Sequence, residues 1–295
     1  MRRRCDVAPA IKRFKSLWEY VGFEGSPLTI RMPRDIGRVF ERVAEAGYHG
    51  IESPLPAADQ EPAFRLLLAD YGLAFIAQVL TGGPDHAASF AAQIERAASF
   101  DPLFIVSQSG KDSDGPKEQL AFFEQALKME RSIGIPVAHE THRGRALYTP
   151  WHTAVMLQQL PELKINADFS HWCCVAESLL EEQDDAMELA CQRSIHIHGR
   201  VGHREGPQVA DPRAPEFAQE LSVHESWWKR IIQSRLAQGA ETITFTPEFG
   251  PPGYMPTLPY TRQPVVDLWE VNLWMADRLE HLAKETAAEW EEEAK

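Results

Sequence analysis

Hydrophobic and polar positions along the chain follow a repeating order, in which a short apolar segment is followed by a turn and then by an amphipathic helical segment. In 36–43 apolar residues lie at positions i, i+3, i+4 and i+7, which is the spacing of a helix with one buried face. Pro33 precedes this segment, Gly47 ends it, and the apolar segment 48–52 comes next. One such unit therefore predicts a strand and its helix.

The same unit is found eight times, roughly every 30 residues, the length of a strand-helix-strand unit. Strands are expected at 14–20, 48–52, 74–80 and 103–107 and before Glu140, Asp168, His198 and Glu248, with a last helix over 264–293. Alternating strands and helices of this number predict an α/β fold that is a single (β/α)8 barrel. An open doubly wound sheet is the alternative, but the chain lacks both the GxGxxG and the GxxxxGK phosphate loops.

The sequence is expected to form one domain over 1–295. Its eight strands and intervening helices occupy 13–250, and 251–295 supplies the final helix with the acidic tail 289–293. One connection, 199–221, is long and rich in turn residues. A loop of this length in a compact domain is usually functional or mobile, so it is interpreted either as a loop that covers the substrate or as a surface excursion.

The segment 194–204, S-I-H-I-H-G-R-V-G-H-R, contains two histidines that alternate with two isoleucines. Successive side chains of a strand point to opposite faces, so His196 and His198 should share one face and Ile195 and Ile197 the other. A lone histidine in a strand is more often a core or surface residue than a ligand. The interpretation of this segment as part of a metal site therefore rests on three acidic residues at the ends of other strands.

Three further strands close on an acid, at Glu140, Asp168 and Glu248. The C-terminal ends of barrel strands meet at one face, so these carboxylates and His198 are expected to bind one divalent metal ion. This ligand set suits Mn²⁺, Mg²⁺ or Co²⁺, with Zn²⁺ also compatible. A metal that holds two vicinal sugar oxygens polarises a carbonyl, and Glu140 and Glu248 could then move the proton of the neighbouring carbon.

The composition of the sequence limits the kinds of molecule that the protein is expected to bind. Of 295 residues, 44% are hydrophobic and 25% are charged, and 43 acids against 30 bases give a net charge of −13. An acidic surface repels nucleic acid, and no apolar run approaches the ~20 residues of a membrane span. The basic start 1–4 is not followed by an apolar segment, and the four cysteines show no CxxC spacing. We expect a cytoplasmic protein with reduced thiols that acts on a small molecule, with homo-oligomers left open.

Glu52 ends the second expected strand and is either a carboxylate of the site or an anchor of its loop. Trp18, Phe23 and Trp172 are large aromatic residues that could present an apolar face to a sugar ring, although core packing is the more ordinary role of such side chains. Gln208, in the long connection, is a further candidate for a substrate contact.

The four-ligand pattern, the D-x-x-H run from Asp168 to His171, and Arg204 six residues after His198 resemble the xylose isomerase-like superfamily of sugar isomerases and epimerases. Within it, the ketose 3-epimerases of the D-tagatose and D-psicose type are the nearest. The resemblance implies that Glu140, Asp168, His198 and Glu248 bind the metal, and that Glu140 and Glu248 double as the acid and base. It also implies that His171 and Arg204 hold oxygens of the substrate.

The chain departs from these relatives at two places. Six residues after Glu140 it has Ala146, where the epimerases carry a second glutamate, and two residues after Glu140 it has His142, where the aldose isomerases carry a lysine. The DNA-repair endonucleases of the superfamily use additional histidines that this chain lacks. A metal-dependent sugar isomerase or epimerase is therefore expected, with a dehydratase of sugars or inososes on the same barrel as the alternative.

Overall fold

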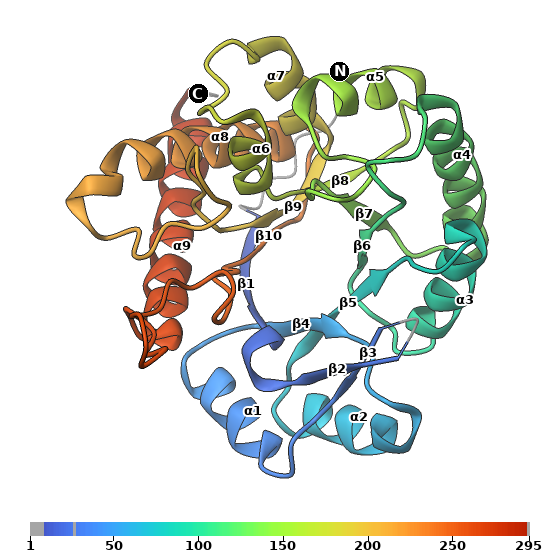
Figure 1. The fold of residues 1–295 in the computed structure, drawn as a ribbon, viewed down its shortest axis with the longest axis vertical. Coiled ribbons are helices and arrows are strands. Elements are labelled where there is room, and N and C mark those ends of the chain that lie inside the picture. Colours follow the sequence, from blue (N-terminus) through green and yellow to red (C-terminus); the bar gives the residue numbers. More distant parts are fainter. Residues whose placement is uncertain (1–8, 26–27, 294–295) are drawn as a thin grey trace.

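A closed barrel of eight parallel strands forms the centre of the computed structural model, which describes residues 9–25 and 28–293 (Figure 1). The basic start 1–4 lies outside the described residues. Each strand pairs with its neighbours in the order β1-β10-β9-β8-β7-β6-β5-β4, and β4 closes the ring on β1. The barrel strands are β1 (Ala10–Ser16), β4 (Gly50–Pro54), β5 (Ala74–Leu80), β6 (Ile105–Gln108), β7 (Val137–Glu140), β8 (Ile165–Ala167), β9 (Ser194–His198) and β10 (Thr242–Thr246). The predicted (β/α)8 barrel is confirmed.

Helices surround the barrel on all sides, as Figure 1 shows. They are α1 (Ile36–Glu45), α2 (Glu61–Asp70), α3 (His86–Ala98), α4 (Pro116–Ile133), α5 (Pro150–Gln159), α6 (Ser170–Ala176), α7 (Asp184–Arg193), α8 (Ala218–Ala237) and α9 (Leu268–Glu293). Each turns its apolar face to the barrel, and these faces together with apolar side chains of the strands form the larger of two hydrophobic clusters. Among the described residues, no helix is long and apolar enough to cross a membrane.

A smaller cluster lies inside the barrel, away from the C-terminal ends of the strands, and consists of Phe14, Ile76, Phe104, Val106 and Ala138. The ring of Phe14 reaches across to β4, where a Cβ on Gly50 would lie 2.5 Å from that ring and 2.3 Å from the carbonyl oxygen of Ala74. A glycine is therefore required at position 50 for the interior to close. The buried charged side chains Glu140 and His198 lie closer to the C-terminal ends of the strands.

The first strand and the histidine strand differ from expectation. The strand predicted at 14–20 lies instead at 10–16, because Trp18–Tyr20 forms a 3-10 turn that begins at the buried Leu17. In β9 the imidazoles of His196 and His198 do point into the barrel, but Ile195 also packs against the inner cluster while Ile197 joins the outer one. A register shift between β8 and β9 beside Ile165 breaks the strict alternation there.

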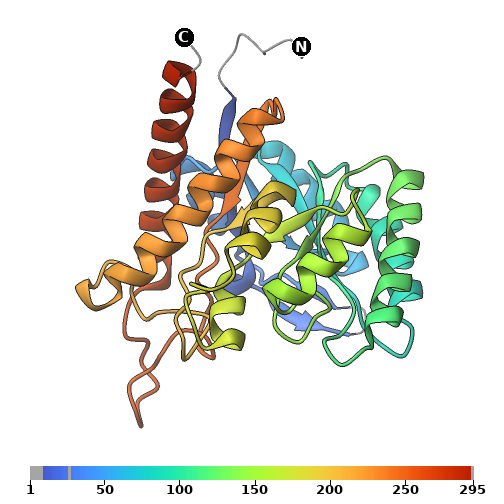
Figure 2. The same ribbon diagram turned by 90° about the horizontal axis from the view of Figure 1, so that it is seen from above.

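The loops at the C-terminal ends of the strands build the mouth of the barrel. A small hairpin, β2 (Gly22–Glu24) and β3 (Thr29–Arg31), follows β1, and segment 251–267 follows β10. Figure 2 shows both at the same end of the barrel, opposite the C-terminal end of α9. Neither the hairpin nor helix α6 follows from the apolar periodicity, because both are shorter than the windows in which periodicity can be recognised.

Candidate metal centre and substrate pocket

Four residues from consecutive barrel segments meet at this mouth. Glu140 ends β7, Asp168 follows β8, His198 ends β9 and Glu248 lies two residues past β10. One ligand atom from each lies within 4.8 Å of the others, and all four side chains are buried. The structure thus brings together the four residues that the sequence predicts as metal ligands.

Two of the four residues, Glu140 and His198, present atoms to the centre of the cluster that lack hydrogen-bond partners within the described residues. Both carboxylate oxygens of Glu140 are buried and unpaired, and the buried Nδ1 of His198 lies 2.9 Å from Oε2 of Glu248 without the geometry of a hydrogen bond. Leaving buried polar atoms unsatisfied costs free energy, so such a cluster is typical of a site that binds a ligand. Three carboxylates and one imidazole are donors for a divalent cation such as Mg²⁺, Mn²⁺ or Zn²⁺. The residues present therefore fit a metal ion.

Glu52 holds the histidine of this cluster from below. Its Oε1 accepts a hydrogen bond of 2.8 Å from Nε2 of His198, which leaves Nδ1 to face the other three residues. The same carboxylate accepts from Gln78 Nε2 at 2.9 Å and also contacts Thr246 and His196. A carboxylate behind a ligating histidine fixes its tautomer and makes it a stronger donor. Glu52 is therefore part of the site.

Asp168 is held by Arg200, a residue that the sequence did not single out. The Arg200 guanidinium, which is 1% exposed, donates to Asp168 Oδ2 and lies 2.7 Å from Nε2 of His171. His171 is itself buried and lies 3.5 Å from Asp168, as the D-x-x-H run suggested. The Arg200 guanidinium therefore links Asp168 and His171 at this side of the site.

Arg204, the predicted substrate contact, is not brought to this cluster. Its side chain is 43% exposed and pairs with Glu181 on the surface at 2.7 Å. The reason is the path of the loop. A hydrogen bond from Val209 N to Val201 O and a bridge between His203 and Gly206 close a short turn, and Arg204 lies within this turn. Arg200 instead follows His198 by two residues and stays inside the barrel mouth.

The pKa shifts of these residues follow from their burial and from the charges of their neighbours. Burial raises the pKa of Glu140, and it raises the pKa of Asp168 to about 6 against the opposing effect of Arg200. Burial alone would lower the pKa of His198, but the carboxylates of Glu248 and Glu52 hold it well above its usual value. A positive charge at the centre of the cluster would therefore stabilise the ionised acids, and a divalent ion would supply that charge.

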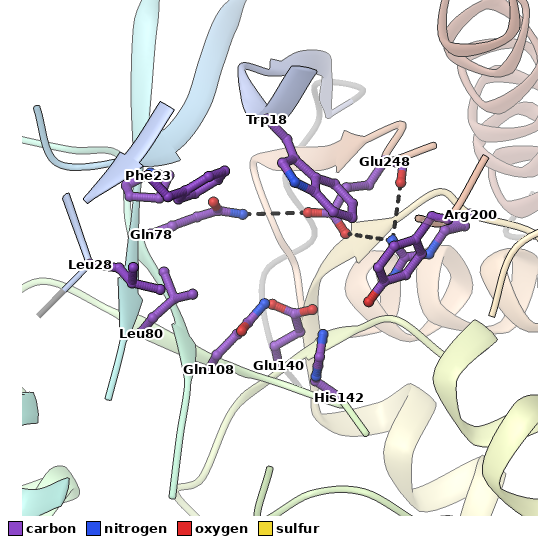
Figure 3. A pocket seen from close by; sticks show the side chains of 12 residues that line it. Trp18, Phe23, Leu28, Gln78, Leu80, Gln108, Glu140, His142, Arg200 and Glu248 are labelled. Carbon is purple, nitrogen blue, oxygen red and sulfur yellow. Dashed lines mark hydrogen bonds and ion pairs between the residues drawn. The ribbon is translucent and has the colours of Figure 1, made fainter. Parts of the chain in front are cut away.

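A cavity of about 260 Å³ opens above the cluster and is lined by Glu140 and Glu248 themselves. Figure 3 shows His142 and Arg200 beside the two glutamates and Gln108 next to Glu140, while Phe23, Leu28 and Leu80 lie on the opposite side together with Gln78, whose amide points toward Glu248. The remaining lining residues are Trp18, Pro54 and Tyr254. The volume suits a small molecule and lies near the lower limit of ~300 Å³ for typical ligand pockets.

The aromatic residues considered as substrate contacts and the long connection after β9 can be placed relative to the cavity. Trp18 and Phe23 line the cavity, whereas Trp172 is fully buried and stacks on Phe169 in the core. The long connection spans 199–217, since α8 begins at Ala218. Its Gln208 exchanges two hydrogen bonds with the backbone of Gly250. Only Arg200 of this connection lines the cavity, so the loop buttresses the mouth and does not cover the cavity.

Some site residues had weak signals in the sequence. Arg200 continues the inward alternation of His196 and His198 by one more step, a pattern that could have pointed to it. Gln78 and Gln108 end or nearly end their strands, which is where barrel enzymes carry functional groups. Tyr254 lies in the irregular segment 251–267, and no periodicity or motif could have placed it in the cavity.

Comparison with known proteins gives a consistent picture. Solved structures with this fold include L-ribulose 3-epimerase, with 12% identity, a TM-score of 0.58 and 98% of this chain and 97% of that one covered. A xylose isomerase-like barrel protein from Mycobacterium smegmatis in complex with magnesium has 13% identity, a TM-score of 0.57 and coverage of 85% and 89%. The 3-keto-D-glucoside 4-epimerase of E. coli has 12% identity, a TM-score of 0.52 and coverage of 92% and 99%.

At such low identities these structures establish the fold alone. No curated protein matches the chain by sequence. A family model does, and its description is the xylose isomerase-like TIM barrel, matched over residues 40–214. That match covers more than half of the chain and ends after the strand that carries His198. The protein is therefore a member of the xylose isomerase-like TIM barrel family.

Proposed function

We propose that this protein is a divalent-metal-dependent isomerase or epimerase of a sugar or sugar derivative, acting by proton transfer at the carbon next to a carbonyl. The observation that carries the proposal is the position of Glu140 and Glu248, which are at once members of the four-residue cluster and part of the cavity wall. A ketose 3-epimerase and a keto-glucoside epimerase among the proteins of this fold support the same reaction class.

A divalent ion held by Glu140, Asp168, His198 and Glu248 would bind vicinal oxygens of the substrate and polarise its carbonyl. The two glutamates lie at the wall of the cavity, so each can take or return a proton at the substrate carbon that it faces. Epimerisation needs one such group on each face of the carbon, and we assign these two roles to the carboxylates from β7 and the end of β10. Burial of both side chains keeps bulk water away from the transferred proton.

Arg200 and His171 are proposed to orient the substrate on the side of Asp168. Arg200 lines the cavity, and its Nη1 lies 3.6 Å from Oε2 of Glu248. His171 accepts from Arg200 through Nε2, so its Nδ1 carries the hydrogen and has no partner within the part of the chain that is described. Both groups are donors, which is what hydroxyl and carbonyl oxygens of a sugar require.

The test is solvent exchange. Purified protein loaded with Mn²⁺ is incubated with ketoses and keto-sugars in D2O, and deuterium at the carbon next to the carbonyl is followed by NMR and mass spectrometry. Glu140→Gln and Glu248→Gln should each lower the exchange rate by ~10² or more, because a positioned acid or base contributes 10²–10⁴-fold. A product lighter by one water would identify a dehydratase instead. Turnover with no deuterium in any product would contradict proton transfer.

A further inference from the structure

The cavity above the metal cluster has two chemically different sides. Every charged side chain that lines it lies on the side of β7, β9 and β10, and these are Glu140, Arg200 and Glu248, with His142 beside them. The opposite side is built by Phe23, Leu28, Pro54 and Leu80, from the β2–β3 hairpin and the ends of β4 and β5. Figure 3 shows Phe23, Leu28 and Leu80 grouped across the cavity from the glutamates. We call these four residues the apolar wall.

The aromatic side chain between the two sides is fixed in place. The indole of Trp18 lies so close to the backbone of Gly250 that an added Cβ would stand 2.3 Å from its ring. Its other neighbour is Tyr254, whose ring meets it edge to face at a centroid distance of 4.8 Å. A glycine at 250 is therefore required for this position of Trp18, and the apolar side of the cavity is extended by a rigid aromatic face.

The polar groups nearest to the apolar wall are the amides of Gln78 and Gln108, and each is hydrogen-bonded through one of its two polar atoms. Gln78 donates through Nε2 to Glu52 at 2.9 Å and lies 3.5 Å from Glu248. Gln108 accepts from Arg145 Nη2 at 3.4 Å. The four side chains of the apolar wall offer neither a donor nor an acceptor. Substrate hydroxyls placed against them would lose their hydrogen bonds to water without replacement, which costs free energy.

Phe23 shows that the wall is not simply part of the core. It is 43% exposed, although it lines a cavity, and no other aromatic ring of the described residues packs against it. An exposed aromatic ring at the mouth gains free energy when an apolar group of a ligand covers it, in proportion to the area buried. Scattered exposed apolar residues need no such explanation, but this one continues the surface formed by Leu28 and Leu80.

We infer that the substrate carries an apolar substituent, which contacts the apolar wall while its carbonyl and neighbouring hydroxyls face the metal cluster. Two kinds of molecule have this chemistry, namely a sugar whose terminal hydroxymethyl is reduced to a methyl, and a keto-sugar glycoside with an apolar aglycone. The inference rests on the proposed function, since the polar end is assigned by the glutamates. It goes further by naming the group at the other end of the substrate.

Two matched pairs of compounds test the inference. One pair is D-allulose and 6-deoxy-D-allulose, and the other is the methyl and phenyl 3-keto-β-D-glucopyranosides. Exchange of the proton next to the carbonyl in D2O gives kcat/KM for each compound with the Mn²⁺-loaded protein. In at least one pair the more apolar member should be preferred about tenfold or more, because the deoxy sugar places no hydroxyl against a wall without hydrogen-bond partners and the phenyl group buries additional apolar area. The pair that shows the preference identifies the source of the substituent. Equal rates or a reversed preference in both pairs would overturn the inference.

Substitutions locate the preference in the wall. The double variant Phe23→Ala/Leu28→Ala should abolish the preference by lowering kcat/KM for the more apolar member about tenfold more than for the less apolar member, because the lost contacts are apolar. Leu28→Ala alone should reduce it partly. The matched control is Leu66→Ala, which removes a side chain that is 62% exposed on α2, away from the cavity, and should leave the preference unchanged. A preference that survives the double variant would place its origin elsewhere.

Calorimetry separates failure of the inference from failure of the proposed function. If none of the four compounds exchanges a proton, tighter binding of the more apolar members that the double variant abolishes still supports the inference, while the proposed reaction fails. Exchange without preference sustains the reaction and overturns the inference. A second copy of the chain is the other candidate to cover Phe23. If the double variant lowers the mass in solution and leaves the preference intact, the wall is an interface.

Discussion

Two arginines follow His198 on the same connection, and their contacts assign them different roles. Arg200 is buried against Asp168 and His171, whereas Arg204 is exposed and pairs with Glu181. Exposed ion pairs contribute ~0–1 kcal/mol to stability, while a sheltered charge-assisted contact contributes ~1.5–3 kcal/mol. The family pattern in the sequence pointed to Arg204 and the structure places Arg200 at the cluster, because spacing along a loop does not record where the loop turns.

Conservative substitutions separate the two residues. Arg200→Lys keeps the charge but loses the planar fork that reaches Asp168 and His171 together, so kcat/KM should fall by ~10-fold to 10². Arg204→Lys, the matched control, should change kcat/KM by less than about twofold. Steady-state kinetics on the preferred substrate, with metal content measured for both variants, makes the comparison. A larger loss in Arg204→Lys than in Arg200→Lys would return the substrate contact to the position expected from the sequence.

At the scale of an element, α8 is attached to the barrel mouth by a buried histidine. His224 accepts a hydrogen bond from Gly202 N at Nε2 and donates from Nδ1 to the carbonyl of Glu220. The rings of Trp227 and Trp228 and the thiol of Cys173 surround it, and it is 0% exposed. Both ring nitrogens are committed in the neutral form, so the helix and the connection after β9 are joined only while the ring stays uncharged.

Stability should therefore fall as the pH is lowered. Burial lowers the pKa of His224 to about 4, against about 6.5 in an unfolded chain. Below pH 6.5 the unfolded state takes up a proton that the folded state refuses, so unfolding becomes easier until about pH 4, by up to ~3 kcal/mol. Urea unfolding at pH 7, 6 and 5 should show a smaller loss for His224→Gln than for the wild type. His281→Gln, in a residue that is exposed on α9, serves as the control and should lose stability in parallel with the wild type.

At the scale of the whole molecule, the candidate ligands come from four consecutive strand ends, β7 to β10. An ion bound there joins half of the barrel circumference at one point, and anything that binds only the folded state stabilises it by mass action. After treatment with a chelator, Mn²⁺ at ~100 times its Kd should raise stability by about 2.7 kcal/mol, or several degrees in Tm. Asp168→Asn should lose this shift. A Tm that none of Mn²⁺, Mg²⁺, Co²⁺ or Zn²⁺ moves would contradict the metal centre.

Much of this architecture could be predicted from the sequence, because it depends on local periodicity. Apolar residues at 36–43 and their counterparts specify helices with one buried face, and short apolar runs between them specify strands buried on both sides. Eight such units close into a barrel, and closure brings the strand ends to one face. The convergence of Glu140, Asp168, His198 and Glu248 follows from that geometry and needs no detail of any loop.

The tertiary structure alone decided the features that depend on irregular backbone. Arg200 rather than Arg204 reaches the cluster, Ile195 faces inward at a register shift, and Tyr254 enters the cavity from a segment without periodicity. Contacts between residues far apart in sequence, such as Glu52 Oε1 with His198 Nε2 or Trp18 with Gly250, set these positions. A linear pattern records which side chains are apolar and how often they recur. It does not record the path of a loop, and the path determines which side chains the substrate meets.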